Sequence, residues 1–473
     1  MTTTAKELEV LFAKQREARW RVASTTAEER RRKLRRLGDA IRLNREAIYE
    51  AIRGDYGKHP QETELTEIWP TLEEIAHAST HLAKWMKPGR VPTPLVATGG
   101  TSHVRYEPLG LVLILSPWNY PFHLALVPLA AAVAAGNCVI LRPSDKTPRT
   151  ARLLHDIISK DFPPDEISVV LGGHEAADKL LELPFDHIFF TGSPAIGRKV
   201  MAAAAKNLAS VTLELGGKSP AIVDAGANIQ SAAESVAWGK FINAGQTCVA
   251  PDYVLVRQEA AGDLAEALAA RVRRSYGMDA RDMLASDSLA CLISDASLAR
   301  LEAAVRETVT AGARILLGGV SDPGRRRLAP TILTDVPNDS AIMQEEIFGP
   351  VLPLVPYRTL DEAIAIIRAR PKPLAMYIFS RDRSAVEQLL AQTTAGGTTI
   401  NNTLMHLANP NLPFGGVGES GMGAYHGRHG FECFSHARAV YYQKLPPANK
   451  AVFPPYDRTT GFAVQGLRCV TGK

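Results

Sequence analysis

Apolar residues recur at helical spacing through the first part of the chain, from about residue 5 to residue 85. In the run "EERRRKLRRLGDAIRL" (residues 28–43), Leu34, Leu37 and Ile41 fall on one face of a helix. This periodicity predicts a mostly helical N-terminal segment. The basic residues of the run then form a solvated helix face, and we expect no nucleic-acid binding there.

Two details bear on where these helices start. Thr25 and Glu28 have the spacing of a capping box, which predicts the beginning of the basic helix. The first twenty residues carry Glu7, Glu9 and Glu17 and lack the apolar core of a signal peptide. We therefore expect another amphipathic helix at the N-terminus.

Beyond Gly110 the pattern changes to short, continuous apolar runs that alternate with helical segments. The expected strands span residues 111–115, 138–142, 167–171, 186–190 and 210–215. The expected helices lie near residues 122–135, 148–159, 176–181 and 195–206. This alternation predicts an α/β fold with a parallel sheet covered on both faces. Such sheets bind nucleotides at the carboxyl ends of their strands.

A second α/β region follows Gly216. Its expected helices lie near residues 231–244, 262–276 and 296–311, and an expected strand spans residues 253–256. The apolar stretches "ARILLG" and "EEIFGPVLPLVPY" follow the last of these helices. Two segments stand apart from this alternation. Residues 87–108 are rich in Pro, Gly and Thr, which predicts loops and an exposed hairpin. Residues 437–445 have strand character and are expected to leave the body of the domain.

Composition places the chain among soluble proteins with more than one domain. Its 473 residues are 46% hydrophobic with a net charge of +5, and this length favours two or three domains. The five cysteines are scattered without a CxxC pair, so we expect neither a disulfide framework nor a zinc site. The longest apolar run, residues 124–141, is interrupted by a proline, a glycine and an asparagine, and predicts a helix, a turn and a strand. With no hydrophobic anchor after Pro446, we place the protein in the cytoplasm.

One cysteine has an unusual setting. The stretch "NAGQTCVAP" (residues 243–251) surrounds Cys248 with small and polar residues, and Gly245, Gln246 and Thr247 are poor material for a packed core. By itself, Cys248 is equally a small buried hydrophobe. A reactive thiol needs a base and an oxyanion donor from elsewhere in the chain.

Polar residues at the carboxyl ends of the expected strands supply such partners. Glu214 ends one strand and is a candidate base, and Asn119 follows another, with an amide that can donate to an oxyanion. A third strand leads into "FTGSPAIG" (residues 190–197), a glycine-rich turn that exposes backbone N–H groups and a helix dipole to a phosphate. Singly, these features also fit a surface ion pair, an Asx turn and a tight turn. Together they provide what covalent acyl chemistry beside a dinucleotide requires.

Two further patterns do not indicate sites. Gly416, Gly418 and Gly421 form a GxGxxG motif, but no strand precedes them, so we interpret this stretch as a loop packed close to another backbone. His426 and His429 lack a third ligand at suitable spacing. We interpret both as structural histidines and expect no metal.

Motifs along nearly the whole chain, from about residue 5 to residue 445, resemble those of aldehyde dehydrogenases. They include "WNYPFHLALVPLAAAVAAGN", "FDHIFFTGS", "VTLELGGKSP", "WGKFINAGQTCVAP", "MQEEIFGPVLP" and "LPFGGVGESGMGAYHGRHGFECFSH", in the order and spacing of that family. The resemblance is closest to the class 3 branch, which includes the fatty and aromatic aldehyde enzymes.

The resemblance implies an α/β fold with a Rossmann-like cofactor domain, a catalytic domain and a protruding hairpin that pairs subunits. The implied division is residues 1–86 and 104–215 for the cofactor-binding domain, 216–432 for the catalytic domain, 87–103 and 433–447 for the oligomerisation hairpin, and 448–473 for a C-terminal tail. A homodimer is the implied assembly. The long C-terminal membrane helix of the fatty aldehyde branch is missing, so no membrane anchor is expected.

The resemblance also implies catalytic roles. Cys248 is the nucleophile, and its backbone N–H and the Asn119 amide bind the oxyanion. Glu214 activates the water that hydrolyses the resulting thioester. A free cysteine has a pKa of about 8.5, so the site must favour the thiolate or use a nearby base.

The implied cofactor is NAD or NADP. Its implied contacts are Trp118, Arg142, Ser144, Asp145, Gly192, Ser193, Gly197, Leu215, Gly216, Glu346 and Phe348. Arg142 and Asp145 stand where Lys and Glu are common beside the adenosine ribose, which leaves the choice between NAD and NADP open. The substrate, a medium-chain aliphatic or aromatic aldehyde, is expected in a tunnel. The expected tunnel residues are Tyr120, Trp238, Leu404 and His406.

Two alternatives stand beside the oxidation of an aldehyde to its acid. An acylating relative passes the thioester to CoA or another thiol, and Glu214 argues against it because hydrolysis needs that base. A catalytically silent binding or structural protein of the same fold is expected to have lost Cys248 or Glu214, and both are present.

Overall fold

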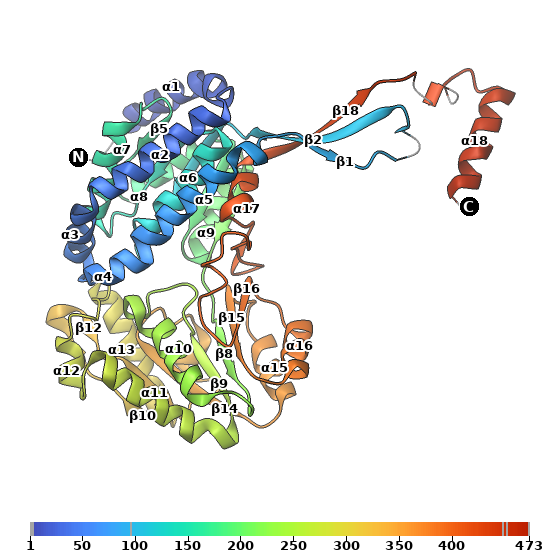
Figure 1. Cartoon of the computed structure of the whole chain (residues 1–473). Helices are drawn as coiled ribbons and strands as arrows, with labels where there is room; N and C mark the ends of the chain where they lie inside the picture. The colour runs from blue at the N-terminus through green and yellow to red at the C-terminus, as the bar shows by residue number, and fades with distance from the viewer. Residues whose placement is uncertain (1–3, 95–96, 447–448, 451–452, 472–473) are drawn as a thin grey trace.

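The structure is a computed structural model that describes residues 4–94, 97–446, 449–450 and 453–471. Two α/β bodies form most of the molecule, and an arm of strands leaves the first of them (Figure 1). The first body combines an N-terminal layer of helices with a six-stranded sheet, and the second contains a seven-stranded sheet. The predicted α/β fold class is confirmed.

The N-terminal layer is helical, as its periodicity predicts. Its elements are α1 (Ala5–Ala23), α2 (Ala27–Leu43), α3 (Arg45–Tyr56), α4 (Pro60–Thr63), the π-helical turn η1 (Glu64–Ile68) and α5 (Trp69–Trp85). Leu34, Leu37 and Ile41 of α2 are at most 1% exposed. They form the face of α2 that packs on α5 and α6 (His123–Ala135).

The predicted cap of α2 is wrong by one residue. Thr26 and Glu29 form the capping box, in place of Thr25 and Glu28. Both pairs fit the motif, but the Thr25 hydroxyl donates instead to the carbonyl of Val22 at the end of α1 (2.6 Å). A contact with the preceding helix thus selects between two equivalent sequence registers.

The six-stranded sheet follows the predicted alternation of strands and helices. Its strands are β3 (Leu111–Leu115), β4 (Cys138–Arg142), β5 (Ile167–Val169), β6 (His187–Thr191), β7 (Ser210–Glu214) and β17 (Gly421–Met422). After α6, the connecting helices are α7 (Pro148–Asp161), α8 (His174–Glu182) and α9 (Pro194–Ala205). Every residue of β3, β4 and β6 is buried, because helices cover both faces of the sheet.

The strand order β17-β7-β6-β3-β4-β5 places a topological switch point between β3 and β6. All neighbouring pairs are parallel except β17 with β7. Connections leave β3 toward β4 on one side, while β6 lies on the other side, the arrangement that in doubly wound sheets leaves a crevice at the carboxyl ends of the two strands. Doubly wound sheets bind their ligands at such a crevice. The loops after these two strands carry Asn119 and Gly192.

The second body is built on a seven-stranded sheet in the order β10-β13-β14-β9-β8-β15-β16. Its strands are β8 (Pro220–Val223), β9 (Tyr253–Arg257), β10 (Arg314–Leu317), β13 (Thr331–Thr334), β14 (Val351–Tyr357), β15 (Ala375–Phe379) and β16 (Gly397–Ile400). Its helices are α10 (Ile229–Phe241), α11 (Ala261–Tyr276), α12 (Ala280–Ala285), α13 (Asp295–Thr310), α14 (Ala341–Gln344), α15 (Leu360–Arg368) and α16 (Arg383–Gln392). Smaller elements are the ribbon of β11 (Ser321–Asp322) with β12 (Arg327–Leu328) and the 3₁₀ turns η3 (Ile242–Gly245), η4 (Gln258–Ala260) and η5 (Pro323–Arg325).

The arm is a three-stranded antiparallel sheet in the order β1-β2-β18 (Figure 1). Its strands are β1 (Gly89–Val91), β2 (Gly100–Pro108) and β18 (Ser435–Gln443), and α17 (Gly427–Cys433) leads into β18. β18 pairs with β2 along its whole length. Residues 95–96 and 447 of the expected hairpin lie outside the described residues.

The last helix, α18 (Arg458–Thr471), lies beyond the arm and apart from both bodies (Figure 1). Over the described part of the chain, no helix has the length and apolarity that crossing a membrane would take.

The glycine-rich loop before α17 packs against backbone, as predicted. Gly421 of β17 lies opposite Glu214 of β7, and a Cβ on Gly421 would lie 2.3 Å from the carbonyl oxygen of Leu213. A Cβ on Gly416 would lie 1.9 Å from the carbonyl oxygen of Ser420. The interpretation of this GxGxxG motif as a close-packed loop is confirmed.

Candidate active site

The loop that carries Cys248 begins with a tight turn after α10. Asn243, Ala244 and Gly245 have φ angles of 54°, 51° and 73°, in a region that side chains other than Asn and Asp rarely adopt. At Gly245 a side chain is also excluded, because a Cβ would lie 2.2 Å from the carbonyl oxygen of Gly349. The turn reverses the chain and brings Cys248 to the loop after β3.

Hydrogen bonds join these two loops. The Asn119 amide donates to the carbonyl of Gln246 (3.1 Å), while the Asn243 amide donates to the same carbonyl (3.1 Å) and to that of Asn119 (2.8 Å). The hydroxyls of Tyr120 and Thr247 lie 2.6 Å apart. A side-chain amide has two N–H donors, and the carbonyl of Gln246 takes one of those of Asn119. Asn119, the predicted oxyanion donor, therefore lies beside residues 243–251. We call this segment, which carries the predicted nucleophile Cys248, the nucleophile loop.

Glu214 ends β7 with a buried carboxyl group. The residue is 3% exposed, and neither carboxyl oxygen has a hydrogen-bond partner among the described residues. Burial raises the pKa of Glu214 well above its usual range. Its carbonyl accepts the N–H of Gly192 (3.0 Å), which fixes the backbone at the sheet edge. A buried carboxyl without a partner is typical of groups that exchange protons in active sites.

The surroundings of Cys248 hold the thiol in its neutral form. Burial raises the pKa of Cys248 to about 12, and the negative charges of Glu346 and Glu214 add to the shift. Of the two routes expected from the sequence, a site that favours the thiolate or a nearby base, a raised pKa of the thiol favours the second. A base must take the thiol proton before attack.

Glu346 lies against the chain that leaves β7. A Cβ on Gly216 would lie 2.1 Å from a carboxyl oxygen of Glu346, so only glycine permits this approach. Burial raises the pKa of Glu346 to about 8, with a further contribution from Asp252. Its Oε1 is buried and has no hydrogen-bond partner among the residues that the structure describes. This orphaned acceptor in a glycine-lined space fits the hydroxyl groups of a ribose.

The turn between β6 and α9 has the geometry of a phosphate cradle. Ser193 is the N-cap residue of α9 and makes no side-chain capping bond. Pro194 has no N–H and the N–H of Ile196 donates to the Ser193 carbonyl (3.1 Å), so among the described residues the N–H of Ala195 is the first-turn donor that remains for an anion. A Cβ on Gly197 would lie 2.8 Å from Leu215, and this glycine therefore lets α9 approach β7 closely. At Gly192 a Cβ would lie 2.4 Å from the ring of Phe190.

Aromatic rings border the same crevice. Trp118, after β3, meets Phe348 edge to face with ring centres 5.4 Å apart. The ammonium group of Lys146 lies 5.9 Å from the Trp118 ring centre. Ser144 is buried, and its hydroxyl accepts the N–H of Lys146 (3.3 Å).

Arg142 and Asp145, the two expected ribose contacts, bind each other. The Nη2 atom of Arg142 donates to Asp145 (2.9 Å) and to the carbonyl of Gly172 (2.7 Å). The Arg142 side chain is 10% exposed and that of Asp145 is 44% exposed. Within the described part of the chain, the buried Nε atom of Arg142 has no hydrogen-bond partner. The guanidinium thus compensates the charge of Asp145 and retains donor capacity.

The expected tunnel residues lie in different environments. Leu404 and His406 are buried, and His406 lies 2.8 Å from the Thr399 hydroxyl and stacks on Phe414. Burial lowers the pKa of His406 to about 4 and keeps it neutral. Trp238, on α10, is 42% exposed. Tyr120 is the member of this group that contacts the nucleophile loop directly, through the hydrogen bond between its hydroxyl and that of Thr247.

This constellation has counterparts among known proteins. A model of the aldehyde dehydrogenase family matches residues 1–440. The chain belongs to the aldehyde dehydrogenase family. A 4,4'-diaponeurosporen-aldehyde dehydrogenase from Staphylococcus aureus is 45% identical to this chain. The match covers 90% of this chain and 92% of the Staphylococcus aureus protein.

Two further comparisons indicate the branch of the family to which the dehydrogenase is most similar. Human aldehyde dehydrogenase family 3 member B1 is 44% identical over 91% of this chain and 90% of its own. A substrate-bound structure of Staphylococcus aureus AldH matches with a TM-score of 0.92 and 42% identity, covering 97% of this chain and 99% of that one. The resemblance to the class 3 branch is confirmed. The dehydrogenase belongs to a family of NAD(P)-dependent enzymes that act on aldehydes.

Sequence reasoning missed several residues that hold the site of the dehydrogenase together. The Tyr377 hydroxyl, on β15, donates to the carbonyl of Val249. The Gln246 side chain donates to the carbonyl of Cys291 (3.1 Å) and accepts the N–H of Ile293 (2.9 Å). No local pattern marks these contacts, because each joins residues that are distant in sequence.

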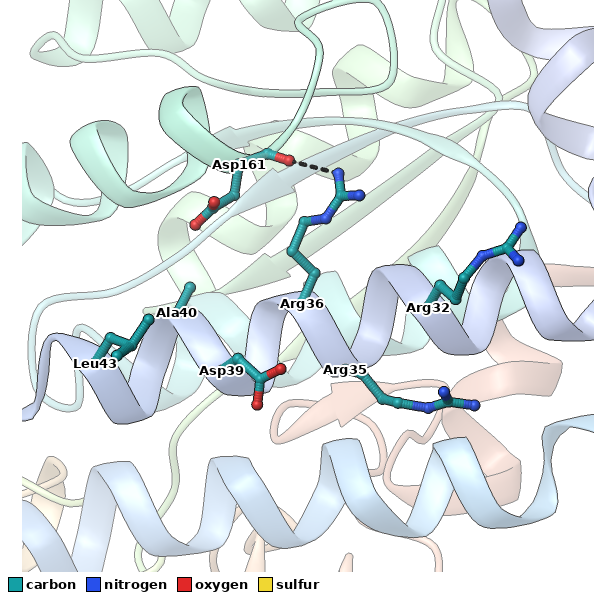
Figure 2. A pocket seen from close by; sticks show the side chains of 7 residues that line it. All are labelled: Arg32, Arg35, Arg36, Asp39, Ala40, Leu43 and Asp161. Carbon is teal, nitrogen blue, oxygen red and sulfur yellow. Dashed lines mark hydrogen bonds between the residues drawn. The ribbon is translucent and has the colours of Figure 1, made fainter.

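A basic surface hollow of about 330 Å³ lies on α2 of the dehydrogenase (Figure 2). Arg36 points to Asp161 and donates to its carbonyl (3.0 Å), and Arg35 pairs with Glu28 (2.9 Å). None of the predicted site residues lines this hollow. These arginines bind their own neighbours, which agrees with the expected solvated helix face.

Proposed function

We propose that this dehydrogenase oxidises medium-chain aliphatic or aromatic aldehydes to carboxylic acids through a covalent intermediate on Cys248. The observation that carries the proposal is the convergence of three groups near the switch point of the first sheet. They are the Cys248 thiol, the Asn119 amide beside its loop, and the buried, unpartnered carboxyl of Glu214. This set contains a nucleophile, an oxyanion donor and a base.

The first half of the reaction forms a bond between Cys248 and the aldehyde. The thiol gives its proton to a base from the solvent, the sulfur attacks the carbonyl carbon, and the carbonyl oxygen becomes an oxyanion. The free N–H of Asn119 and the backbone N–H of Cys248 donate to that oxyanion. When it collapses, the carbon loses its hydrogen with the bonding electrons and becomes a thioester. An oxidised nicotinamide, when bound, supplies the hydride acceptor for this step.

The second half releases the acid. The Glu214 carboxylate takes a proton from water as the water attacks the thioester carbon. The carbon–sulfur bond breaks, the carboxylic acid leaves, and Cys248 recovers its thiol. Burial raises the pKa of Glu214, which strengthens it as a base once it is ionised.

The residues around the crevice fit a nicotinamide dinucleotide. The orphaned Oε1 of Glu346 suits a ribose hydroxyl, and the first turn of α9 after Ser193 suits a phosphate. Trp118 and Phe348 border the space with their rings. In the proposed assignment these residues hold the dinucleotide at the carboxyl ends of β3 and β6.

Substrate length provides the test of the proposed function. We expect octanal to have at least roughly ten times the kcat/KM of acetaldehyde, because each CH₂ buried in a tunnel contributes about 0.8 kcal/mol. The kcat/KM values are measured for a panel of aliphatic and aromatic aldehydes, with and without CoA. The absorbance of the reduced cofactor reports the rate of each reaction. Equal values for acetaldehyde and octanal contradict the tunnel, and a strict requirement for CoA contradicts hydrolysis.

The cofactor prediction concerns Arg142. We expect the dehydrogenase to accept NADP as well as NAD, because Arg142 compensates Asp145 and keeps an unpartnered Nε donor for a 2′-phosphate. Arg142→Ala should weaken kcat/KM for NADP by roughly 1.5–3 kcal/mol, the range for a hydrogen bond to a charged group, with little change for NAD. Arg152→Ala, which removes an exposed arginine from α7, is the matched control. A wild-type enzyme inert with NADP, or equal losses with both cofactors, refutes this assignment.

We also propose that the arm pairs two copies of the chain. Within the described residues, β18 has a partner strand on one side only, and its Tyr441 and Tyr442 are 44% and 56% exposed. An open strand edge invites pairing, and a two-fold axis closes it. Light scattering at micromolar concentration should give the mass of a dimer. A monodisperse monomer argues against this role of the arm.

A further inference from the structure

The segment from α3 to η1 carries charged groups that have no contact with solvent. Lys58 and Glu67 are both 0% exposed, with Lys58 Nζ 2.7 Å from a Glu67 carboxyl oxygen. Lys58 Nζ also lies 4.1 Å from the centre of the Tyr120 ring. A buried ion pair carries a desolvation cost that apolar residues of the same volume avoid. Packing alone therefore gives no reason for these charges.

Glu67 and Tyr56 hold the loop that carries Asn119. The second carboxyl oxygen of Glu67 accepts the backbone N–H groups of Phe122 (2.9 Å) and His123 (3.3 Å). The Tyr56 hydroxyl donates to the carbonyl of Asn119 (2.9 Å). Glu67 belongs to the π-helical turn, a local irregularity that helices often use at functional sites.

Glu62 and Tyr56 also hold the nucleophile loop. A Glu62 carboxyl oxygen accepts the N–H of Asn243 (2.7 Å), the first residue of the positive-φ turn. The Tyr56 carbonyl accepts the N–H of Cys291 (2.8 Å), and the Cys291 carbonyl accepts the side-chain amide of Gln246 (3.1 Å). One short segment thus binds both loops of the site, although the loops come from different bodies.

We propose that Tyr56, Glu62 and Glu67 are positioning residues that set the distance between the Asn119 amide and Cys248. The inference rests on the proposed function, in which that amide stabilises the oxyanion. The bonds of these three residues to the loops end on backbone atoms, so they fix where each loop lies, whatever side chain the loop carries. A displacement of about 1 Å at a reacting centre is enough to cost roughly 10²-fold in rate.

A double-mutant cycle separates positioning from general stability. Tyr56→Phe keeps the ring and removes the hydroxyl that donates to the Asn119 carbonyl. At saturating octanal and NAD, we expect it to lower the pre-steady-state rate of reduced cofactor formation about tenfold. In an Asn119→Ala background the same change should alter the rate less than about twofold, because the amide that it positions is gone. The KM for NAD should stay unchanged in both backgrounds.

The matched control for this cycle lies on the same helix. Tyr49→Phe removes a tyrosine–carboxylate hydrogen bond to Glu64 that touches neither loop. This variant should keep the wild-type rate, and thermal unfolding of every variant reports on stability.

The outcomes distinguish the inference from the function on which it rests. A Tyr56→Phe variant with the wild-type rate, or one equally impaired with and without the Asn119 amide, overturns the positioning role. An Asn119→Ala variant with the wild-type rate overturns the oxyanion role itself, and the inference with it.

Glu62 gives an independent test, because its bond needs only an acceptor oxygen. Glu62→Gln keeps that oxygen, and the rate should stay within about twofold of wild type, whereas Glu62→Ala should lower it about tenfold. Equal losses in both variants show that the charge of Glu62 matters and not its bond to Asn243, and they contradict the assignment.

Discussion

Cys248→Ala is expected to lower aldehyde oxidation by at least roughly 10⁴-fold, the scale on which loss of a catalytic nucleophile acts. Without the sulfur no covalent bond to the carbonyl carbon forms, and the remaining groups bind an aldehyde that they cannot activate. Steady-state rates with octanal and NAD measure the loss. Because the sulfur is hydrogen-bonded only within its own loop, to the backbone N–H groups of Cys248 and Val249 among the described residues, thermal stability should stay close to that of the wild type.

Cys291→Ala is the matched control for this loss. Cys291 lies next to the nucleophile loop, but its contacts there use its backbone atoms. The activity of the Cys291→Ala variant should stay near that of the wild type. If Cys248→Ala keeps more than a few per cent of wild-type activity, the nucleophile lies elsewhere.

Glu214→Gln is expected to leave the first half of the reaction, formation of the thioester, intact and to block the second half, its hydrolysis. Rapid mixing with aldehyde and NAD should show a burst of about one equivalent of reduced cofactor per active site. The steady-state rate that follows should fall by about 10²–10⁴-fold, the usual contribution of a general base. The reason is the order of steps, since attack by Cys248 precedes water activation.

The pH profile provides a second reading of the same variant. Burial raises the pKa of Glu214, so the fraction of the carboxylate that can act as a base grows as the pH rises toward that pKa. Deacylation by the wild type should therefore speed up with pH, and Glu214→Gln should lose this dependence. Glu419→Gln removes an exposed carboxylate instead and should behave as wild type. A Glu214→Gln variant with the wild-type turnover rate rules out this role.

Local sequence was sufficient for most elements of the first body. The runs at residues 111–115 and 138–142 coincide with β3 and β4, because strands buried on both faces leave continuous apolar runs. The run at residues 167–171 extends past β5, which ends at Val169. Apolarity marks burial and not strand pairing: the N–H of Val170 still donates to the carbonyl of Leu141 on β4 (2.9 Å), and the apolar Leu171 lies beyond this bond. The cap of α2 was misplaced for a related reason, since two overlapping registers fit the motif equally.

The candidate site was accessible from sequence because parallel strands end at a common edge. Glu214 and Asn119 each follow an apolar run, so topology alone predicts that they lie near each other. Their partners were not accessible in this way. Glu62 and Asn243 are separated by 181 residues, and Glu62 stands in none of the motifs. Hydrogen bonds between distant backbone and side-chain atoms leave no periodic trace in a sequence.

The amino-acid sequence by itself determined the α/β alternation, the family and the residue types available for thiol chemistry, because these depend on local pattern and on motifs. Only the tertiary structure decided which loops meet, and how. It placed Asn119 against the Cys248 loop, left the Glu214 carboxyl without a hydrogen-bond partner among the described residues, and raised the pKa of Cys248 to about 12. Burial and charge depend on every atom that packs around a group, and most of those atoms belong to residues that are distant along the chain.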